Sequence, residues 1–219
     1  MDTKKLLAEL LGTFTFFTIG FMAILSQKAF FPGGNLIVIA FGFGFGLFAA
    51  IQIFGGVSGG HFNPAVTVAA VIDKRLDPMT GVGYIVSQLI GGIAAAVVIL
   101  LVFSQAAVAE TVTQPGNGVD TVKALLLETL FTAFFLLVIL VSTKKAPTQA
   151  AFAIPLTLLV IHFALVPFTG SSVNPARSIA PAIVGGNLTD LWIYIVGPVV
   201  GGIIGWGVYR VATGEVDAA

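Results

Sequence analysis

Six apolar runs of about 20 residues each place the tightest limit on what this chain can fold into. They lie at 6–25, 36–54, 82–103, 122–142, 150–168 and 191–209. A helix of about 20 apolar residues crosses the hydrocarbon core of a bilayer. Only 9% of the 219 residues are charged, whereas about 25% is typical of a soluble domain. The runs therefore predict an integral membrane protein with six transmembrane helices.

The polar composition excludes several classes of protein. Cysteine is absent, so disulfides, thiol catalysis and cysteine-ligated metals are excluded. The two histidines, His61 and His162, are too few for a typical histidine metal site. The net charge is zero and the charges are scattered, which argues against a nucleic acid partner. We expect no metal or cofactor. The sequence contains nothing that resembles a nucleophile–base pair, so we do not expect an enzyme.

The basic residues predict the orientation in the membrane. With six spans, one side carries Lys4, Lys5, Lys74, Arg75, Lys144, Lys145 and Arg210. The opposite side carries only Lys28 and Lys123. Because loops rich in Lys and Arg stay in the cytoplasm, both termini are expected there.

The two halves of the chain repeat each other within one domain, 1–219. The segment 59–67 (GGHFNPAVT) is answered by 170–178 (GSSVNPARS), and Glu9, Thr13 and Phe16 match Glu128, Thr132 and Phe135. Each half, 1–110 and 119–219, holds three spans, so the second half is inserted upside down. Such inverted repeats place sites at the membrane midplane between the halves.

Both halves contain the tripeptide Asn-Pro-Ala, as Asn63-Pro64-Ala65 and Asn174-Pro175-Ala176. Asn is a favoured N-cap and Pro fits the first helical turn, so one isolated copy would indicate only a helix start. Here each copy precedes a short apolar stretch, 66–72 or 178–184. At 1.5 Å per residue, about ten residues reach half-way across a bilayer. Two re-entrant half-helices therefore meet at the centre, where irregular backbone is tolerated only if it lines an aqueous cavity.

Six spans, two Asn-Pro-Ala boxes and the run SVNPARS at 172–178 resemble the aquaporin (major intrinsic protein) family over essentially the whole chain. The resemblance is to its bacterial water channels. It implies an all-α membrane protein, a right-handed bundle of six spans and two half-helices in an inverted 3+3 repeat. It also implies a passive water channel, a homotetramer and a prokaryotic plasma membrane. The close-packing face of Gly42 and Gly46 lies on a helix that forms subunit contacts in that family.

The resemblance assigns pore roles residue by residue. Asn63 and Asn174 would point side-chain donors at the pore centre, where two helix dipoles repel protons and cations. The carbonyls of Gly59, Gly60, His61, Phe62, Gly170, Ser171, Ser172 and Val173 would form the acceptor ladder for water. The selectivity filter would consist of Phe43, His162, Ser171 and Arg177.

Several of these positions have a second interpretation. Arg177 could instead form a structural salt bridge, and His162 could be a core histidine. Glu9 and Glu128 could form a proton relay, although a supporting role for the re-entrant loops, with help from Gln88, is favoured.

Two other functions compete with a water channel. A glycerol facilitator would carry a small residue in place of His162, and an acid and a base in place of Ser178 and Ala182. Ile195, however, stands where water channels usually have Trp. A secondary transporter also uses inverted repeats, but no acidic residue flanks either box.

Overall fold

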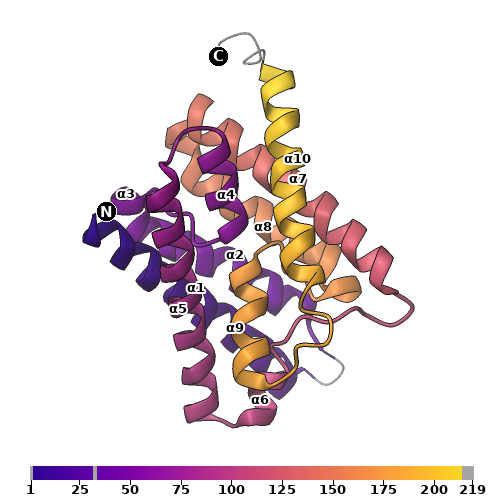
Figure 1. Cartoon of the computed structure of the whole chain (residues 1–219). Coiled ribbons are helices and arrows are strands. Elements are labelled where there is room, and N and C mark those ends of the chain that lie inside the picture. Colours follow the sequence, from indigo (N-terminus) through magenta and orange to yellow (C-terminus); the bar gives the residue numbers. More distant parts are fainter. Residues whose placement is uncertain (1, 32–33, 214–219) are drawn as a thin grey trace.

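The structure, a computed structural model, describes residues 2–31 and 34–213, and these residues contain helices and no strand. The elements follow in the order α1 (Thr3–Phe30), α2 (Leu36–Ala50), η1 (Ile51–Gly55), α3 (Gly56–Ser58), α4 (Pro64–Ile72), α5 (Pro78–Val102), α6 (Gln105–Ala109), α7 (Thr121–Lys145), α8 (Pro147–Thr169), α9 (Pro175–Gly185) and α10 (Ile193–Thr213) (Figure 1).

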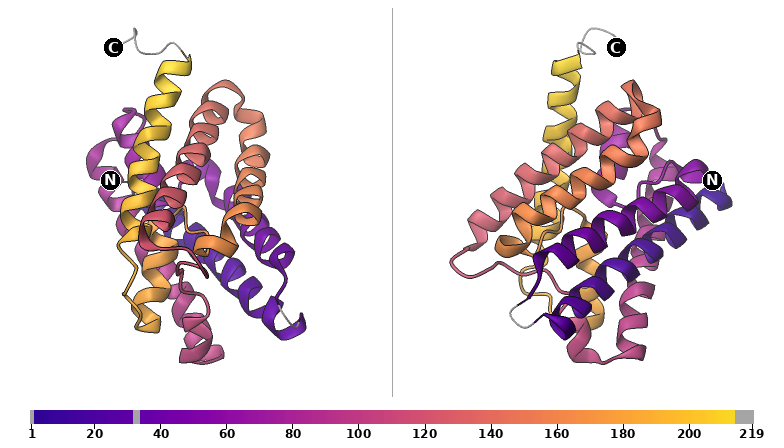
Figure 2. Two further views of the ribbon diagram at one scale, coloured as in Figure 1. Left: turned by 90° about the vertical axis from the view of Figure 1, so that its right-hand side faces the viewer. Right: turned by 180° about the vertical axis from the view of Figure 1, so that it is seen from behind.

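Six helices are long and apolar enough to cross a membrane, which confirms the six predicted spans. They are α1, α2 with its continuation to Ser58, α5, α7, α8 and α10, and they form one tilted bundle (Figure 2). The helices extend beyond the apolar runs because polar residues cap them. Asp77 and Asp120, for example, accept hydrogen bonds from the first turns of α5 and α7.

Glycines bring the spans together in pairs. A Cβ on Gly91 of α5 would lie 2.2 Å from the Leu10 carbonyl oxygen of α1, and a Cβ on Gly201 of α10 would lie 2.3 Å from the Thr129 carbonyl oxygen of α7. These contacts occupy equivalent places in the two halves. Close backbone approach through small residues is how helices associate in lipid.

The Gly42 face of α2 has a different use from the one expected. A Cβ on Gly42 would lie 2.2 Å from the Cβ of Ala23, and one on Gly46 would lie 3.1 Å from the carbonyl oxygen of Phe16. Both neighbours belong to α1. This face therefore packs inside the subunit, and α2 would have to contact a second copy through other residues.

The two short helices α4 and α9 are the predicted half-helices. They have 9 and 11 residues, which is about half the length of a span. Each begins directly after its asparagine, with proline in the first turn. Their two N-terminal ends face the middle of the bundle from opposite directions (Figure 1).

Two local features were not predicted from the sequence. The second span contains a π-helical turn, Ile51–Gly55, before its last residues in α3, whereas a continuous α-helix was expected to residue 54. Beside this turn, a Cβ on Gly60 would lie 3.2 Å from the Cα of Gly55, so the re-entrant loop passes very close to it. The polar connection at 104–121, which joins the two halves, contains the short helix α6, because the Ser104 hydroxyl caps the Ala107 N–H at 3.2 Å.

Candidate functional site

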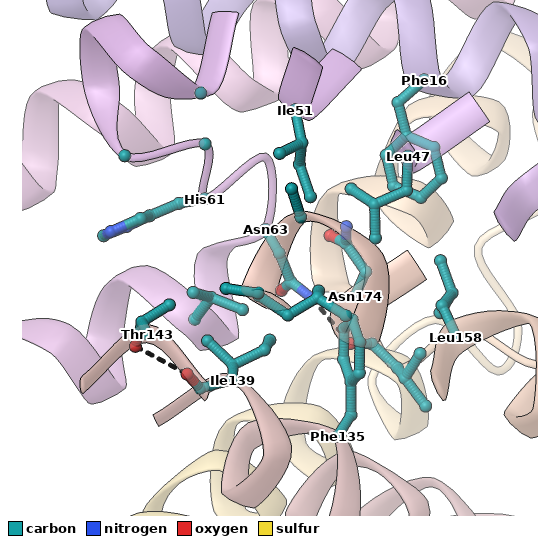
Figure 3. Close-up of a pocket in the computed structure, with 18 of the residues that line it drawn as sticks. Phe16, Leu47, Ile51, His61, Asn63, Phe135, Ile139, Thr143, Leu158 and Asn174 are labelled. Carbon is teal, nitrogen blue, oxygen red and sulfur yellow. Dashed lines mark hydrogen bonds between the residues drawn. The ribbon is translucent and has the colours of Figure 1, made fainter. Parts of the chain in front are cut away.

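The two asparagines of the Asn-Pro-Ala boxes lie side by side at the centre of the bundle (Figure 3). The Oδ1 of Asn63 accepts a hydrogen bond from Ala65 N at 2.9 Å, and that of Asn174 accepts from Ala176 N at 3.0 Å. These bonds confirm the predicted N-caps. They also turn the side-chain NH₂ groups away from the helices they cap.

Each NH₂ group reaches the other half of the chain. Asn63 Nδ2 donates to the Val173 carbonyl at 2.9 Å, and Asn174 Nδ2 donates to the Phe62 carbonyl at 2.9 Å. An amide group has two hydrogens, and within the described residues each asparagine uses one of them here. The inner carbonyls of the expected water ladder, those of Phe62 and Val173, thus already hold one hydrogen bond each.

The loops before the boxes have unusual backbone conformations. Positive φ angles occur at Gly59, Gly60, Phe62, Gly170, Ser171 and Val173. Outside glycine this region is sparsely populated, and a branched residue such as Val173, with φ 44°, is strained there. Such a conformation persists only when the surroundings hold it in place.

Glu9 holds the first loop. Its carboxylate accepts hydrogen bonds from the Ser58 hydroxyl at 2.6 Å, His61 N at 2.9 Å and Phe62 N at 2.8 Å. The side-chain amide of Gln88 donates to it as well, at 2.7 Å. The carboxylate is fully buried and has four donors.

Glu128 holds the second loop in the same way. It accepts from the Thr169 hydroxyl at 2.7 Å, Ser172 N at 2.9 Å and Val173 N at 2.8 Å. Pro198, which has no donor, occupies the position equivalent to Gln88, so this carboxylate has three donors in the described structure. Both glutamates face the loops and are absent from the cavity lining, which favours support over a proton relay.

The four predicted filter residues lie together at one end of the boxes. The ring centroids of Phe43 and His162 are 4.7 Å apart, and the Arg177 guanidinium carbon lies 5.1 Å from the Phe43 centroid. The Ser171 hydroxyl lies 3.4 Å from His162 Nδ1. At most 3% of any of the four is exposed, so the opening between them is narrow.

Hydrogen bonds set the polarity of this filter. His162 Nδ1 lies 3.0 Å from the Leu158 carbonyl. A carbonyl only accepts, so Nδ1 is the donor in this contact, and in the neutral form of the ring this leaves Nε2 as an acceptor. Arg177 Nη1 donates to the Thr111 carbonyl at 2.6 Å. Neither His162 Nε2 nor Arg177 Nε has a protein partner in the described part of the chain, so the filter has an acceptor on the histidine and free donors on the arginine for a permeant molecule.

Arg177 forms no salt bridge within the described residues, in contrast to the alternative considered from the sequence. The rings of Phe21 and Phe43 lie 5.5 and 5.1 Å from its guanidinium carbon, within the range of cation–π attraction. No carboxylate contacts the guanidinium directly in the described structure, although Glu128 interacts with it at longer range, and an arginine charge at a pore constriction repels other cations.

A cavity of about 330 Å³ runs from the filter past both asparagines to Arg75. Its walls are mainly apolar, and Figure 3 shows Phe16, Leu47, Phe135, Ile139 and Leu158 among them. Phe16 and Phe135 occur at matched positions of the two repeats. Equivalent positions in an inverted repeat are expected to lie in equivalent places, and both side chains line the cavity.

A polar cluster around Arg75 and Asp73, here called the clasp, lies at the Arg75 end of the cavity. Arg75 donates to Asp73 at 2.6 Å, to the Thr143 hydroxyl at 2.8 Å and to the Leu140 carbonyl at 3.3 Å. Asp73 also accepts from the Trp206 indole at 2.9 Å. The clasp therefore ties the C-terminal end of α4 to α7 and α10, an arrangement that sequence reasoning did not predict.

Two glycines of α1 accommodate the aromatic residues of the site. A Cβ on Gly12 would lie 2.0 Å from the ring of Phe62, and one on Gly20 would lie 2.6 Å from the ring of Phe43. The first ring belongs to the loop before a box and the second to the filter. Only glycine leaves room for them at these two places.

Six spans, two opposed half-helices and a lined cavity define a membrane channel. The description "Major intrinsic protein" applies to a family model that matches residues 1–209. The chain belongs to this family, whose channels are not enzymes, and it is a multi-pass integral membrane protein.

Curated relatives of two kinds match nearly the full length. Proteins named Aquaporin Z from Photorhabdus laumondii and Rhodopseudomonas palustris are 37% and 38% identical, over 97% and 98% of this chain and 98% and 95% of theirs. "Glycerol uptake facilitator protein-like 6" of Lactiplantibacillus plantarum is 38% identical over 92% of this chain and 94% of its own. The bacterial relatives are consistent with a prokaryotic plasma membrane.

A solved structure confirms the fold. The aquaglyceroporin from Plasmodium falciparum superposes with a TM-score of 0.90, covering 99% of both chains at 22% identity. At this identity the likeness establishes the architecture and not the permeant.

Proposed function

We propose that the protein is a passive water channel that excludes glycerol, protons and ions. The observation that carries this proposal is the filter, where Phe43 and His162 have ring centroids 4.7 Å apart beside the buried Arg177. In this filter, His162 Nε2 can accept a hydrogen bond from a passing water molecule, and the Arg177 guanidinium can donate one to it. These two bonds would replace hydrogen bonds that the water molecule makes to its neighbours in bulk water. A polyol would need a wider opening to pass the same rings.

The centre of the pore supports proton exclusion. The dipole of each half-helix places about half a positive charge at its N-terminus, and the asparagine donors lie at that point. A water held by both donors turns its oxygen toward them and cannot relay a proton onward. The fixed charge of Arg177 adds a second barrier to cations.

The test is stopped-flow light scattering of vesicles that contain the purified protein. Sucrose outside the vesicles drives water efflux, and glycerol outside reports glycerol entry. We expect fast shrinkage in sucrose and glycerol entry close to that of protein-free vesicles. Glycerol flux comparable to water flux would refute the proposed selectivity.

A glycerol facilitator is the second candidate. Its support is the relative from Lactiplantibacillus plantarum, which matches as well as the aquaporins do, together with a cavity of about 330 Å³. The same vesicle experiment separates the two functions, because the facilitator predicts rapid reswelling in glycerol.

We further propose two inverted repeats, 1–110 and 119–219, both termini in the cytoplasm, and a homotetramer with one pore per subunit. Exposed apolar side chains on α1, α2, α7 and α8, such as Leu7, Phe45, Leu130 and Leu156, support helix contacts between copies. Cross-linking in mild detergent should yield four subunits, and a ladder ending at two would contradict the assembly.

A further inference from the structure

Three buried hydroxyl groups form a directed chain from the connection between α6 and α7 to the second box. Thr113 Oγ1 donates to Ser178 Oγ at 2.7 Å, and Ser178 Oγ donates to Ser172 Oγ at 2.7 Å. Ser172 Oγ donates to the Asn174 carbonyl at 2.9 Å. At most 4% of any of these three side chains is exposed. Each hydroxyl has one hydrogen, so the chain runs in a single direction.

The same connecting segment also holds the filter arginine. The Thr111 carbonyl, two residues before Thr113, accepts the 2.6 Å hydrogen bond from Arg177 Nη1. It is the one protein acceptor of the guanidinium in the described part of the chain. A shift of this carbonyl would therefore free the arginine to leave its place beside Phe43.

A third contact fixes the far end of the segment. Gly116 N donates to the Phe168 carbonyl at 2.8 Å, and a Cβ on Gly116 would lie 2.3 Å from the Pro167 carbonyl oxygen. Between this point and the Thr111 carbonyl, the hydroxyl of Thr113 is the side-chain anchor. On the α6 side, Val112 N donates to the Ala109 carbonyl at 3.3 Å, and the Thr111 hydroxyl donates to the Val108 carbonyl at 2.7 Å. The bond from Thr113 to Ser178 is the side-chain contact that ties the segment to the second box on the other side of the Thr111 carbonyl.

The other half of the protein lacks this arrangement. Thr67, the residue equivalent to Ser178, receives its hydrogen bond from Gln88 at 2.9 Å, and Gln88 belongs to a membrane helix. No connecting segment enters there within the described structure. The hydroxyl chain is therefore specific to the half that carries the filter.

We infer that Thr113 is a positioning residue for Arg177 and so helps to set the solute cut-off of the filter. The hydroxyl fixes the segment, the Thr111 carbonyl fixes the guanidinium, and the guanidinium occupies the opening. This inference rests on the proposed water selectivity.

The test compares Thr113→Val with Thr113→Ser in vesicles. Valine keeps the shape and the methyl group next to Gly170 but removes the hydroxyl, whereas serine keeps the hydroxyl. We expect valine to raise the ratio of glycerol to water permeability about three- to tenfold, as the loss of one hydrogen bond allows. Serine should restore the wild-type ratio, a rescue that a purely steric role of the residue would not give.

A control and a second measurement make the result decisive. Thr18→Val removes a hydroxyl that bonds only within α1, to the Phe14 carbonyl at 2.7 Å, and should leave the ratio unchanged. ¹⁵N NMR of labelled arginine should show faster rotation of the Arg177 guanidinium in Thr113→Val than in wild type. The only other arginines are Arg75 and Arg210, so its signal can be assigned by substitution.

The two proposals fail in different ways. If wild-type protein conducts glycerol as fast as water, the proposed function is wrong, and the Arg177 rotation rate still decides the role of Thr113. Unchanged rotation and an unchanged permeability ratio in Thr113→Val would overturn the inference. Equal changes in the valine and serine variants would overturn it as well.

Discussion

The side-chain nitrogen of Asn63 lies 2.9 Å from the carbonyl oxygen of Val173, in the opposite half of the chain. The reciprocal bond from Asn174 to Phe62 has the same length. Together they hold the N-termini of α4 and α9 against each other without any contribution from the filter. The central barrier to protons should therefore survive changes at Arg177.

Arg177→Val tests this independence. The substitution removes a charge and widens the filter, so we expect glycerol entry to rise severalfold, together with entry of methylamine. Proton flux under an imposed potential, followed with a pH-sensitive dye, should increase only slightly because the half-helix dipoles remain. Adding His162→Ala should enlarge the opening further. Free proton conduction by Arg177→Val alone would show that the central barrier is unimportant.

Mercury sensitivity offers a second test of the filter. The chain has no cysteine, so mercuric chloride should leave water flux unchanged. Ser171→Cys places a thiol about where the hydroxyl now lies, 3.4 Å from His162 Nδ1. Mercury on that thiol should block water flux, and a reductant should restore it. An unaffected Ser171→Cys channel would place residue 171 outside the water path.

The carboxylates under the re-entrant loops should be essential for stability. Glu9→Gln and Glu128→Gln each turn a charged acceptor into an amide that faces N–H donors. We expect each to lower the free energy of unfolding by about 3 kcal/mol and to reduce water permeability per folded channel. Thermal unfolding in detergent measures the first effect. The control is Glu110→Gln on the exposed surface, where the carboxylate contacts Lys28.

The clasp around Asp73 gives a prediction for the other end of the cavity. Arg75→Leu removes the bonds to Asp73, Thr143 and the Leu140 carbonyl, so the protein should lose about 2 kcal/mol of stability. Arg75→Lys should rescue little, because lysine lacks the planar fork that reaches three acceptors. The neighbouring Lys74→Gln serves as control. Equal unfolding temperatures for Arg75→Lys and wild type would contradict this geometry.

The two N-cap residues Asp77 and Asp120 should make the stability of the protein depend on pH in the acid range. The pKa of Asp77 lies below its ordinary value of 3.8 because Thr80 donates to it, and that of Asp120 lies below 3.8 because Lys123 does. A lowered pKa in the folded state stabilises the protein above the ordinary value, and this contribution is lost as pH falls through the folded pKa. The double variant Asp77→Asn, Asp120→Asn should therefore unfold at a lower temperature than wild type at pH 7, and this difference should shrink near about pH 3. A constant difference would contradict the shifts.

The parts of the fold that the sequence predicts are those that short-range pattern encodes. Apolar length predicts the spans, and Asn followed by Pro predicts the start of α4 and α9. Because the chain repeats itself, the apolar runs and the Asn-Pro pairs each occur in both halves, and the second occurrence supports the interpretation of the first. The family resemblance, counted from the two boxes, indicated Phe43, His162 and Arg177 as filter residues, and the structure brings these three side chains together.

What the sequence did not predict depends on contacts between distant segments. The π-helical turn at Ile51–Gly55 adjoins a loop that passes Gly55, and no local pattern indicates it. The hydroxyl of Thr113 meets that of Ser178 across 65 residues. Arg75 was read only as a topology signal, because its partners on α7 and α10 are far away in the chain.

The two glycine gaps of α1 have a geometric consequence. Gly12 receives the ring of Phe62 next to the first box, and Gly20 receives the ring of Phe43 in the filter. Eight residues of helix rise about 12 Å, so α1 fixes the distance along the pore between the first box, next to Phe62, and the filter, which contains Phe43. An alanine inserted between these glycines would increase this distance by about 1.5 Å and rotate Gly12 by about 100° relative to Gly20 about the helix axis. No change confined to the pore lining could restore that alignment.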